Sequence, residues 1–429
     1  LMGALHGSVN TAEMPDVMCS LETFVTVIGA VAEVSFFRHC TADFKGGNDM
    51  DFWNAFASLF SNFGNLTWQM VVMWGIGALL IYLAIAKKME PSLLLPMGFG
   101  AILVNLPLSG AITQGDTVGP ISALFEAGMS NELFPLLLFI GIGAMIDFGP
   151  VLTNPKLMLF GAAAQFGIFF TLCMATLCGF GPMESASIAI IGAADGPTSI
   201  VVANHLGISA NNPGLFSAIV VAAYSYMALV PIIQRPVIKL ITTKHERLIR
   251  MEYEQRDVSK LTRILFPVVV TVIAGMVAPA SVALVGFLMF GNLLRECGVL
   301  NALSETAQNV LTNLITIVLG LTVAGQMTAD QFVRPDTLLI LALGLVAFVF
   351  DTIGGVLVAK VYNLFAKQKI NPMIGAAGIS AFPMSARVVN KMGLQEDNQN
   401  FLLMHAVGVN VSGQIASVIA GGMILTLFA

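Results

Sequence analysis

The sequence predicts an all-α polytopic membrane protein with about 10 transmembrane helices in two inverted-topology repeats, each containing a broken or re-entrant helix. Hydrophobic residues make up 56% of the chain and charged residues 10%, whereas soluble globular chains carry about 25% charged residues. Long apolar segments recur along the chain, and the same order of segments occurs twice. The low charge argues against a soluble enzyme, and the net charge of −5 argues against nucleic-acid binding.

The chain begins with an acidic segment of uncertain structure, residues 1–66. Acidic side chains interrupt its one apolar run, residues 21–37. The segment has neither the basic start nor the small-residue cleavage site of a signal peptide.

Ten apolar segments follow, each near the roughly 20 residues that a helix needs to cross about 30 Å of hydrocarbon. They form a first membrane repeat, 67–234, and a second, 264–429, separated by a basic loop, 235–263. We expect the helices near residues 67–86, 92–108, 133–147, 157–180, 214–234, 264–278, 280–294, 309–327, 336–360 and 400–428.

Lysine and arginine set the orientation, because they concentrate in short cytoplasmic loops. The loop 235–263 holds eight of the twenty basic residues and is assigned to the cytoplasm, as are Lys87 and Lys156. This assignment requires segment 186–203 to dip into the membrane and return to the outside. The same logic makes 371–388 a dip from the cytoplasm. A broken span with a miscounted neighbour is the alternative for either segment.

A short internal repeat supports two related halves. Ile191-Gly192-Ala193-Ala194 recurs as Ile374-Gly375-Ala376-Ala377, 183 positions later. Inverted repeats whose halves each contain a Gly/Pro-interrupted segment are typical of transporters, with an ion site between the two interruptions.

Asp195 is the main candidate for an ion ligand in the first interrupted segment. A carboxylate at the centre of a membrane helix costs about 2.5–3.5 kcal/mol on insertion scales, so such acids usually face an ion path or a partner. Gly196 and Pro197 form a hinge next to it, where proline frees backbone carbonyls that a hard cation can use. Capping of the following helix is the alternative role for Asp195.

The second interrupted segment supplies neutral oxygens, a hinge and a cation. Asn371 and Ser380 can complete a Na⁺ shell, and Gly375 is a second hinge. Arg387 offers a planar fork that binds a carboxylate through two hydrogen bonds. Helix capping is the alternative for the neutral residues, and a topological anchor is the alternative for Arg387.

Other polar residues lie inside predicted spans. Asn410 in the last span is either an ion ligand or an interhelical hydrogen-bond donor. Tyr224 and Tyr226 are two of only five tyrosines, and a phenol there either donates a proton or makes one structural hydrogen bond. Asp351 is a secondary ion-path candidate. His205 and His405 have no Glu or second His at metal-ligand spacing, which argues against a transition-metal site.

Several stretches resemble the β subunits of the biotin-dependent, sodium-translocating decarboxylases of oxaloacetate, methylmalonyl-CoA and glutaconyl-CoA. The resemblance runs from about Leu66 to the C-terminus, and Ala193 departs from the glycine expected there. It is carried by Leu83–Lys88, Leu95–Gly100, Met145–Pro150, Gly161–Gly167, Gly192–Thr198, Tyr224–Pro231, Asn371–Arg387 and Met404–Asn410.

The resemblance implies a membrane subunit that decarboxylates carboxybiotin and couples this reaction to Na⁺ export, with consumption of a proton. The implied catalytic residues are Asp195, Tyr226 and Arg387, with Arg387 also binding carboxybiotin. The implied Na⁺ ligands are Asp195, Asn371, Ser380 and Asn410.

The implied setting is a complex in the plasma membrane of a prokaryote. Expected partners are an α subunit or a separate carboxyltransferase with a biotin carrier protein, a small γ or δ membrane subunit, and further copies of the chain. The chain has no Met-Lys-Met biotinylation signal, so another polypeptide must carry biotin. The rival function is a secondary Na⁺/H⁺ or Na⁺-coupled anion transporter, and a passive channel is a third possibility.

Overall fold

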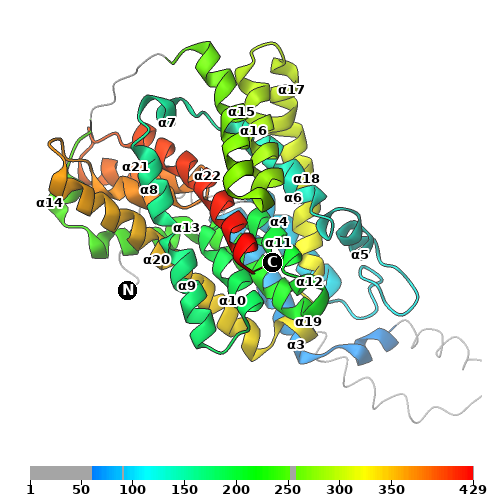
Figure 1. Cartoon of the computed structure of the whole chain (residues 1–429). Coiled ribbons are helices and arrows are strands. Elements are labelled where there is room, and N and C mark those ends of the chain that lie inside the picture. Colours follow the sequence, from blue (N-terminus) through cyan, green and yellow to red (C-terminus); the bar gives the residue numbers. More distant parts are fainter. Residues whose placement is uncertain (1–59, 89–90, 252–257, 429) are drawn as a thin grey trace, which may run out of the picture. The chain divides into compact units, whose positions relative to one another are not determined.

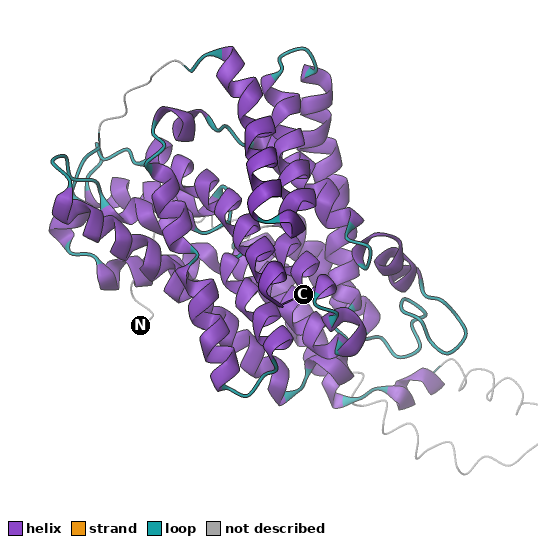
Figure 2. Ribbon diagram, in the orientation of Figure 1, coloured by secondary structure: helices purple, strands orange, loops and turns teal. Residues whose placement is uncertain are grey.

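Helices account for all the regular elements that the computed structural model describes (Figure 2). The described residues are 60–88, 91–251 and 258–428. Extended pairing within these ranges is limited to one isolated bridge between Gln114 and Thr117. The prediction of an all-α membrane protein is confirmed. Most of the acidic segment 1–66 lies outside the described residues, and its described part contains η1 (Ser61–Asn65).

Six predicted spans correspond to runs that are long and apolar enough to cross a membrane. They are α3 (Trp68–Ala86), α8 (Leu157–Ala164) with α9 (Phe166–Leu177), α15 (Lys260–Val277), α17 (Asn301–Glu305) with η5 (Thr306–Leu311) and α18 (Thr312–Gly325), α20 (Pro335–Phe365), and α22 (Leu403–Phe428).

Two further spans are bent. The helices α5 (Pro120–Leu124) and η2 (Phe125–Met129) join α6 (Leu133–Met145) at 65°, and α13 (Pro213–Ile241) bends by 68°. In α13, Pro231 lies in the second arm, where it removes a backbone donor and clashes with the preceding turn. Residues 235–241, which the sequence assigns to the loop 235–263, belong to this helix.

The predicted number of about 10 spans is not confirmed. Over the described residues, length and composition support six spans, or eight with the bent pairs. The other two predicted spans are α4 (Pro91–Val104), with 14 residues, and α16 (Val282–Glu296), with 15. At about 1.5 Å per residue, each is near 22 Å long and shorter than the hydrocarbon layer.

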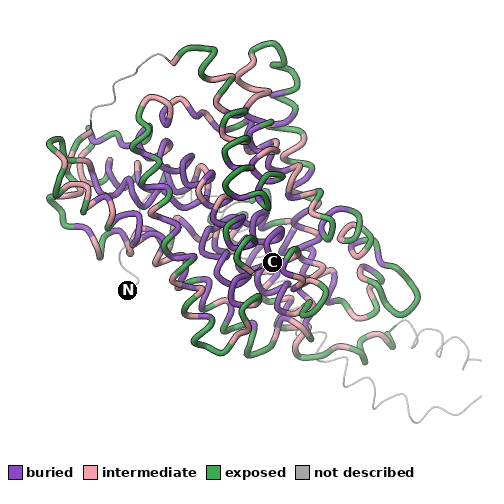
Figure 3. The backbone as a smooth tube through the Cα atoms, viewed as in Figure 1, coloured by how far each residue is buried: buried purple, intermediate pink, exposed green. Residues whose placement is uncertain are grey.

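Within the unit 68–429, the helices pack into two groups that each combine both halves of the sequence (Figure 1). In one group, α3 packs on α4, α4 on α18, α18 on α6, and α6 on α16, which α15 covers. The other group surrounds α20 and α22 and contains both interrupted segments. Buried residues concentrate along this second group (Figure 3).

The first interrupted segment consists of α10 (Pro182–Ala189), η3 (Ile190–Ala193), α11 (Gly196–His205) and α12 (Ile208–Asn211). Ala194 breaks it with a left-handed φ of 51°. The Asn212 side-chain amide donates to Oε1 of Glu184 at 3.2 Å, so the two ends of the segment lie next to each other. This is the geometry of a dip rather than of a crossing.

The second interrupted segment consists of η6 (Pro372–Gly378) and α21 (Met384–Glu396). Asn371 precedes it and Asn400 follows it. Both side-chain amides donate to the same acceptor, the carbonyl of Arg247, at 2.9 and 3.0 Å. This segment also begins and ends at one place, beside the described loop residues 242–251, which contain α14 (Lys244–Arg247).

Candidate functional site

The two interrupted segments touch through their backbones. The N–H of Ser380, just after η6, donates to the carbonyl of Ala193, at the end of η3, over 3.1 Å. Ala193 belongs to the first copy of the internal repeat, and Ser380 follows the second copy by three positions, so the two repeat copies lie close to one junction. Asp195 follows Ala193 by two positions, which places it at the edge of this contact.

Asp195 is 4% exposed and is the N-cap of α11. Its Oδ2 accepts hydrogen bonds from the hydroxyl of Thr198 at 2.7 Å and of Ser417 at 3.3 Å. Its Oδ1 has only the longer contact, 3.5 Å from the Thr198 N–H. The capping alternative is thus realised in the structure, yet the shortest bond comes from a hydroxyl and Oδ1 keeps most of its accepting capacity.

One face of α22 closes the junction. Its residues Asn410, Gln414 and Ser417 are spaced four and three positions apart, which places them on one side of a helix. Asn410 donates to the Ile379 carbonyl at 2.7 Å, and Gln414 donates to the Ser380 carbonyl. The face thus ties the second interrupted segment to Asp195. Oδ1 of Asn410 is buried and has no hydrogen-bond partner among the described residues.

Sequence reasoning missed Thr198, Gln414 and Ser417. Polar residues at helical spacing on an otherwise apolar last span were the available signal for Gln414 and Ser417. Ser380 was expected, and its hydroxyl donates to the Gly413 carbonyl at 3.1 Å. That bond uses the hydroxyl proton and leaves the lone pairs of the oxygen for a further interaction.

Gly375 is held by backbone contact. A Cβ atom on Gly375 would lie 2.1 Å from the Gly355 carbonyl oxygen on α20, and one on Gly413 would lie 2.1 Å from that of Gly378. These positions require glycine because two backbones meet there. Pro197 occupies the first turn of α11, where its missing N–H leaves no helix bond unmade.

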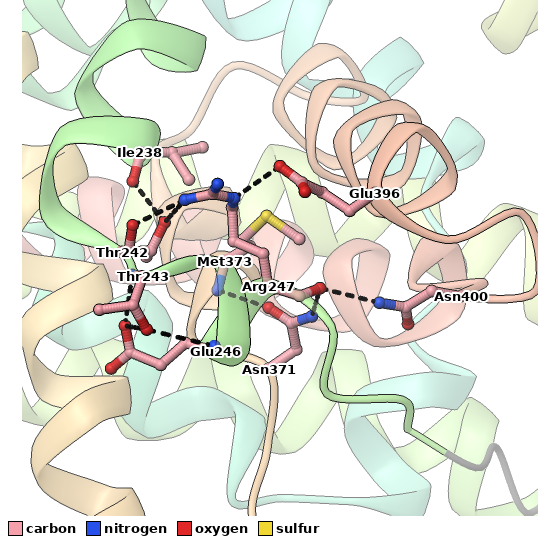
Figure 4. Close-up of polar contacts among 9 residues, drawn as sticks. All are labelled: Ile238, Thr242, Thr243, Glu246, Arg247, Asn371, Met373, Glu396 and Asn400. Carbon is pink, nitrogen blue, oxygen red and sulfur yellow. Dashed lines mark hydrogen bonds and ion pairs between the residues drawn. The ribbon is translucent and has the colours of Figure 1, made fainter.

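Asn371 lies apart from this junction in its contacts (Figure 4). Its Oδ1 accepts from the Met373 N–H at 3.1 Å, and its amide donates to the carbonyls of Arg247 and Ile249, each at 2.9 Å. The Arg247 guanidinium is fixed by Glu396 at 2.7 Å and by the Thr242 carbonyl at 2.7 Å. Asn371 therefore fastens the start of η6 to the loop residues 242–251.

The two tyrosines of α13 have different surroundings. A Cβ atom on Gly196 would lie 2.4 Å from the ring of Tyr224, so this ring covers the residue next to Asp195. The Tyr224 hydroxyl is buried without a partner among the described residues. Tyr226, two positions on and therefore about 200° around the helix, donates to the Leu341 carbonyl on α20. Sequence reasoning singled out Tyr226, whereas the tyrosine beside Asp195 is Tyr224.

Arg387 lies in the first turn of α21 with an exposed side chain. Its guanidinium makes no hydrogen bond or ion pair within the described parts of the chain. Ser385, two positions earlier, faces inward, where its hydroxyl lies 2.8 Å from the amide nitrogen of Gln234 on α13. The helix thus has an anchored inner face and a free cation on its outer face.

The family is decided by comparison with known proteins. The sequence model for the Na⁺-transporting oxaloacetate decarboxylase beta subunit matches residues 69–428. The chain belongs to this family. The match includes both interrupted segments and ends where α22 ends. It leaves the acidic segment outside.

Individual members of the decarboxylase β-subunit family are similar over most of the chain. The oxaloacetate decarboxylase beta chain of Klebsiella pneumoniae is 45% identical, covering 82% of this chain and 94% of that protein. The methylmalonyl-CoA decarboxylase subunit beta of Propionigenium modestum is 46% identical, covering 86% and 97%. The glutaconyl-CoA decarboxylase subunit beta of Acidaminococcus fermentans is 47% identical, covering 86% and 95%.

Proposed function

We propose that this chain is the membrane subunit of a sodium pump that decarboxylates carboxybiotin presented by a partner protein. The reaction drives Na⁺ out of the cell and consumes one proton. The observation that carries the proposal is Asp195, a buried carboxylate at the junction of two interrupted helices, in a chain of this family.

The oxygen atoms around Asp195 suit a small hard cation. Na⁺ prefers carboxylate, hydroxyl and carbonyl oxygens, and a single negative charge balances its own. The proposed ligands are Asp195, Ser380 and Asn410, whose Oδ1 has no other described partner, and Ser417 is a further candidate. Asn371 is the fourth proposed ligand, because its Oδ1 accepts one hydrogen bond from the Met373 N–H and keeps a second lone pair for the ion.

Arg387 is the proposed binding residue for carboxybiotin. Its exposed, unpaired guanidinium presents a planar fork that matches a carboxylate. On decarboxylation the N–C bond breaks, CO₂ leaves, and the nitrogen keeps the electron pair and takes a proton. Holding the carboxylate is thus the work assigned to Arg387, while the proton comes from the transport pathway.

Coupling follows from competition between a proton and Na⁺ for one carboxylate. Asp195 binds Na⁺ in its ionised form and releases the ion when it takes a proton. Tyr226 is the proposed relay for that proton, and the Tyr224 hydroxyl is its rival because the Tyr224 ring lies beside Gly196. Substitution of each tyrosine by phenylalanine distinguishes the two, since only the relay variant slows the pump.

The proposed complex contains a carboxyltransferase α subunit or its separate equivalent, a biotin carrier, and a small γ or δ membrane subunit. Membership of a β-subunit family supports partner subunits in general. The substrate acid is met by the carboxyltransferase, so the three relatives, with three different acids, agree with one role for this chain. The family membership does not favour the secondary-transporter alternative.

The test is ²²Na⁺ uptake by inside-out vesicles that contain the reconstituted complex. We expect uptake to start with the carboxylated substrate and to stop when avidin masks biotin. Asp195→Asn abolishes uptake, whereas Asp336→Asn, an exposed acid on α20, leaves it unchanged. Na⁺ uptake that continues in the presence of avidin would contradict the pump and support a gradient-driven carrier.

A second pair of variants tests the carboxybiotin site. Arg387→Ala should raise the concentration of biotin carrier needed for half-maximal decarboxylation. Lys391→Ala, an exposed cation one turn further along α21, is the matched control and should leave it unchanged. Equal effects of the two substitutions would show that Arg387 acts only through the positive charge of the surface and does not bind carboxybiotin specifically.

A further inference from the structure

Asp351 is a second buried acid, which the proposed mechanism does not use. It lies in the middle of α20 and is 1% exposed. Neither of its carboxyl oxygens has a hydrogen-bond partner among the described residues. Buried polar side chains are almost always paired, so this group calls for a physical explanation.

Backbone rather than side chains surrounds the carboxyl group. A Cβ atom on Gly167, in the first turn of α9, would lie 2.4 Å from Oδ1 of Asp351. One on Gly192, in η3, would lie 3.0 Å from Oδ2 and 3.3 Å from the Ile168 nitrogen. The carboxyl group therefore fits between the start of α9 and the first interrupted segment, in a space that only glycines leave open.

The donors that face this carboxyl group are the N–H groups of Gly167 and Ile168. They belong to the N-terminus of α9, which carries partial positive charge. Neither reaches hydrogen-bond geometry. A metal cation would meet donors and a positive dipole here instead of oxygen ligands, so the site does not suit Na⁺.

Among the residues that the structure describes, no side chain compensates a negative charge at this position. Around α20 pack α8, α9, α10, α13, η3 and η6. Of these, α8, η3 and η6 carry no titratable residue, and Asp195 after η3 is bonded to Thr198 and Ser417. The titratable groups on the others, none of which bonds to Asp351, are Cys173 on α9, Glu184 on α10, and Tyr224, Tyr226, Arg235 and Lys239 on α13.

An ionised carboxylate without partners is far more costly in such an interior than a neutral carboxylic acid. The contacts seen here therefore fit the protonated form. The ionised form becomes favourable only when the first turn of α9 moves so that its N–H groups bond to the carboxylate. Two states of one side chain thus correspond to two positions of α9 relative to α20.

We propose that Asp351 is a proton-binding site whose loading alternates during transport and changes the shape of the first interrupted segment through Gly192. Gly192 contacts the carboxyl group and precedes Asp195 by three positions, so a movement at one reaches the other along η3. The inference rests on the proposed function for its place in the cycle, and the proton is its ligand.

Infrared difference spectroscopy on the purified complex, with and without Na⁺, tests the proposal. We expect Na⁺ to change the carbonyl stretch of a protonated carboxylic acid. Asp351→Asn should remove that band, Asp351→Glu should shift it, and Asp336→Asn should retain it. A Na⁺-induced band that persists unchanged in both Asp351 variants would overturn the proposal.

The pH dependence of Na⁺-stimulated decarboxylation is a second readout. Asp351→Asn is nearly isosteric with the protonated acid and should flatten the profile while retaining the Na⁺ concentration for half-maximal activity. An unchanged profile would also overturn the proposal. The infrared measurement does not depend on transport, so it separates this proposal from the proposed function. If Asp351 binds and releases a proton in a complex whose Na⁺ uptake is unaffected by avidin, the proposed function is wrong and the proton site is supported.

Discussion

The side-chain amide of Asn371 donates to the backbone carbonyl of Arg247 at 2.9 Å, and the amide of Asn400 donates to the same oxygen at 3.0 Å. One peptide group thus holds both ends of the second interrupted segment. Its position depends on the Arg247 guanidinium, which Glu396 and Thr242 fix (Figure 4). The loop residues 242–251 therefore support the second interrupted segment.

Arg247→Ala tests this support. The pair Arg247–Glu396 is largely buried, with side-chain exposures of 13% and 16%. Removing one partner of a buried pair costs about 3 kcal/mol, because the other charge is left without compensation. We expect a clear fall in the midpoint of thermal unfolding and a weaker Na⁺ stimulation of decarboxylation.

Arg250→Ala is the matched control for Arg247→Ala. Arg250 lies three positions along the same loop and pairs with Asp397 at 2.6 Å, but its side chain is 58% exposed. Exposed pairs contribute little. If both variants lose stability equally, the support comes from the loop charge as a whole rather than from the buried Arg247–Glu396 pair.

Asn410→Ala tests the proposed Na⁺ ligand. Its Oδ1 has no other described partner, so its loss should raise the Na⁺ concentration for half-maximal decarboxylation by about tenfold, which is about 1.4 kcal/mol of binding free energy. The measurement is a Na⁺ titration of the initial rate.

Asn105→Ala provides the comparison for Asn410→Ala. Asn105 is also a buried asparagine, but its amide donates to the Ala101 and Met327 carbonyls and its Oδ1 accepts from the Ala329 N–H. Its loss should lower the unfolding midpoint and leave the Na⁺ titration unchanged. An Asn410 variant that behaves in the same way has a structural role only.

Gly375→Ala tests the backbone contact at η6. The added methyl group would lie 2.1 Å from the Gly355 carbonyl oxygen, and overpacking of this kind costs about 1–3 kcal/mol or more. We expect low yields of folded protein and little activity. Gly75→Ala on α3 should be neutral or slightly stabilising, because in the part of the chain that the structure describes the added carbon meets no atom within 4 Å beyond the backbone of its own helix. Similar folded yields for the two variants would contradict the close contact.

Asp397 gives the loop a pH-dependent attachment. The hydrogen bond from Arg250 holds the pKa of this carboxyl below its ordinary value of 3.8. A lowered pKa means that the stabilising contribution is fully present above pH 3.8 and is lost as the pH falls through the folded-state value.

Thermal unfolding of the wild type and Asp397→Asn between pH 6 and pH 3 measures the effect of this attachment. The two midpoints should differ by a small amount at pH 6, because the Arg250 side chain is exposed, and should converge as the pH falls. A difference that grows on acidification would show that the ionised Asp397 is unfavourable in the folded protein.

Part of this architecture could be predicted from the sequence. In a membrane protein, loop charges indicate on which side of the membrane a loop lies, and glycines within apolar segments indicate where helices are interrupted. The loop charges predicted both dips, and the repeat of Ile191–Ala194 at Ile374–Ala377 predicted related segments, which meet at Ala193 and Ser380. Asp195 stood out because acids in apolar segments are rare. Span lengths were less predictable, since α4 ends at Val104, four residues before the end of the predicted span 92–108.

Other features depend on contacts that leave no pattern in the sequence. The acceptor for Asn371 is a backbone carbonyl, and any residue at position 247 would supply one. Tyr224 and Tyr226 lie in equally apolar stretches of sequence. Only the packing of α13 decides which of the two rings covers Gly196. The roles of Asn371 and Tyr226 as ion ligand and proton relay stay predictions.

The glycine contacts at Gly355, Gly375, Gly378 and Gly413 also constrain how this protein can evolve. Where two main chains touch, even one added carbon atom displaces a segment that carries polar groups. A side chain is therefore excluded at both of the glycines that meet. Exposed apolar positions on the outer faces, such as Leu79 and Leu338, have no such constraint. Substitutions should therefore accumulate on the surface that faces lipid. At the backbone contacts, a glycine can be replaced only together with a compensating change in the segment that it touches.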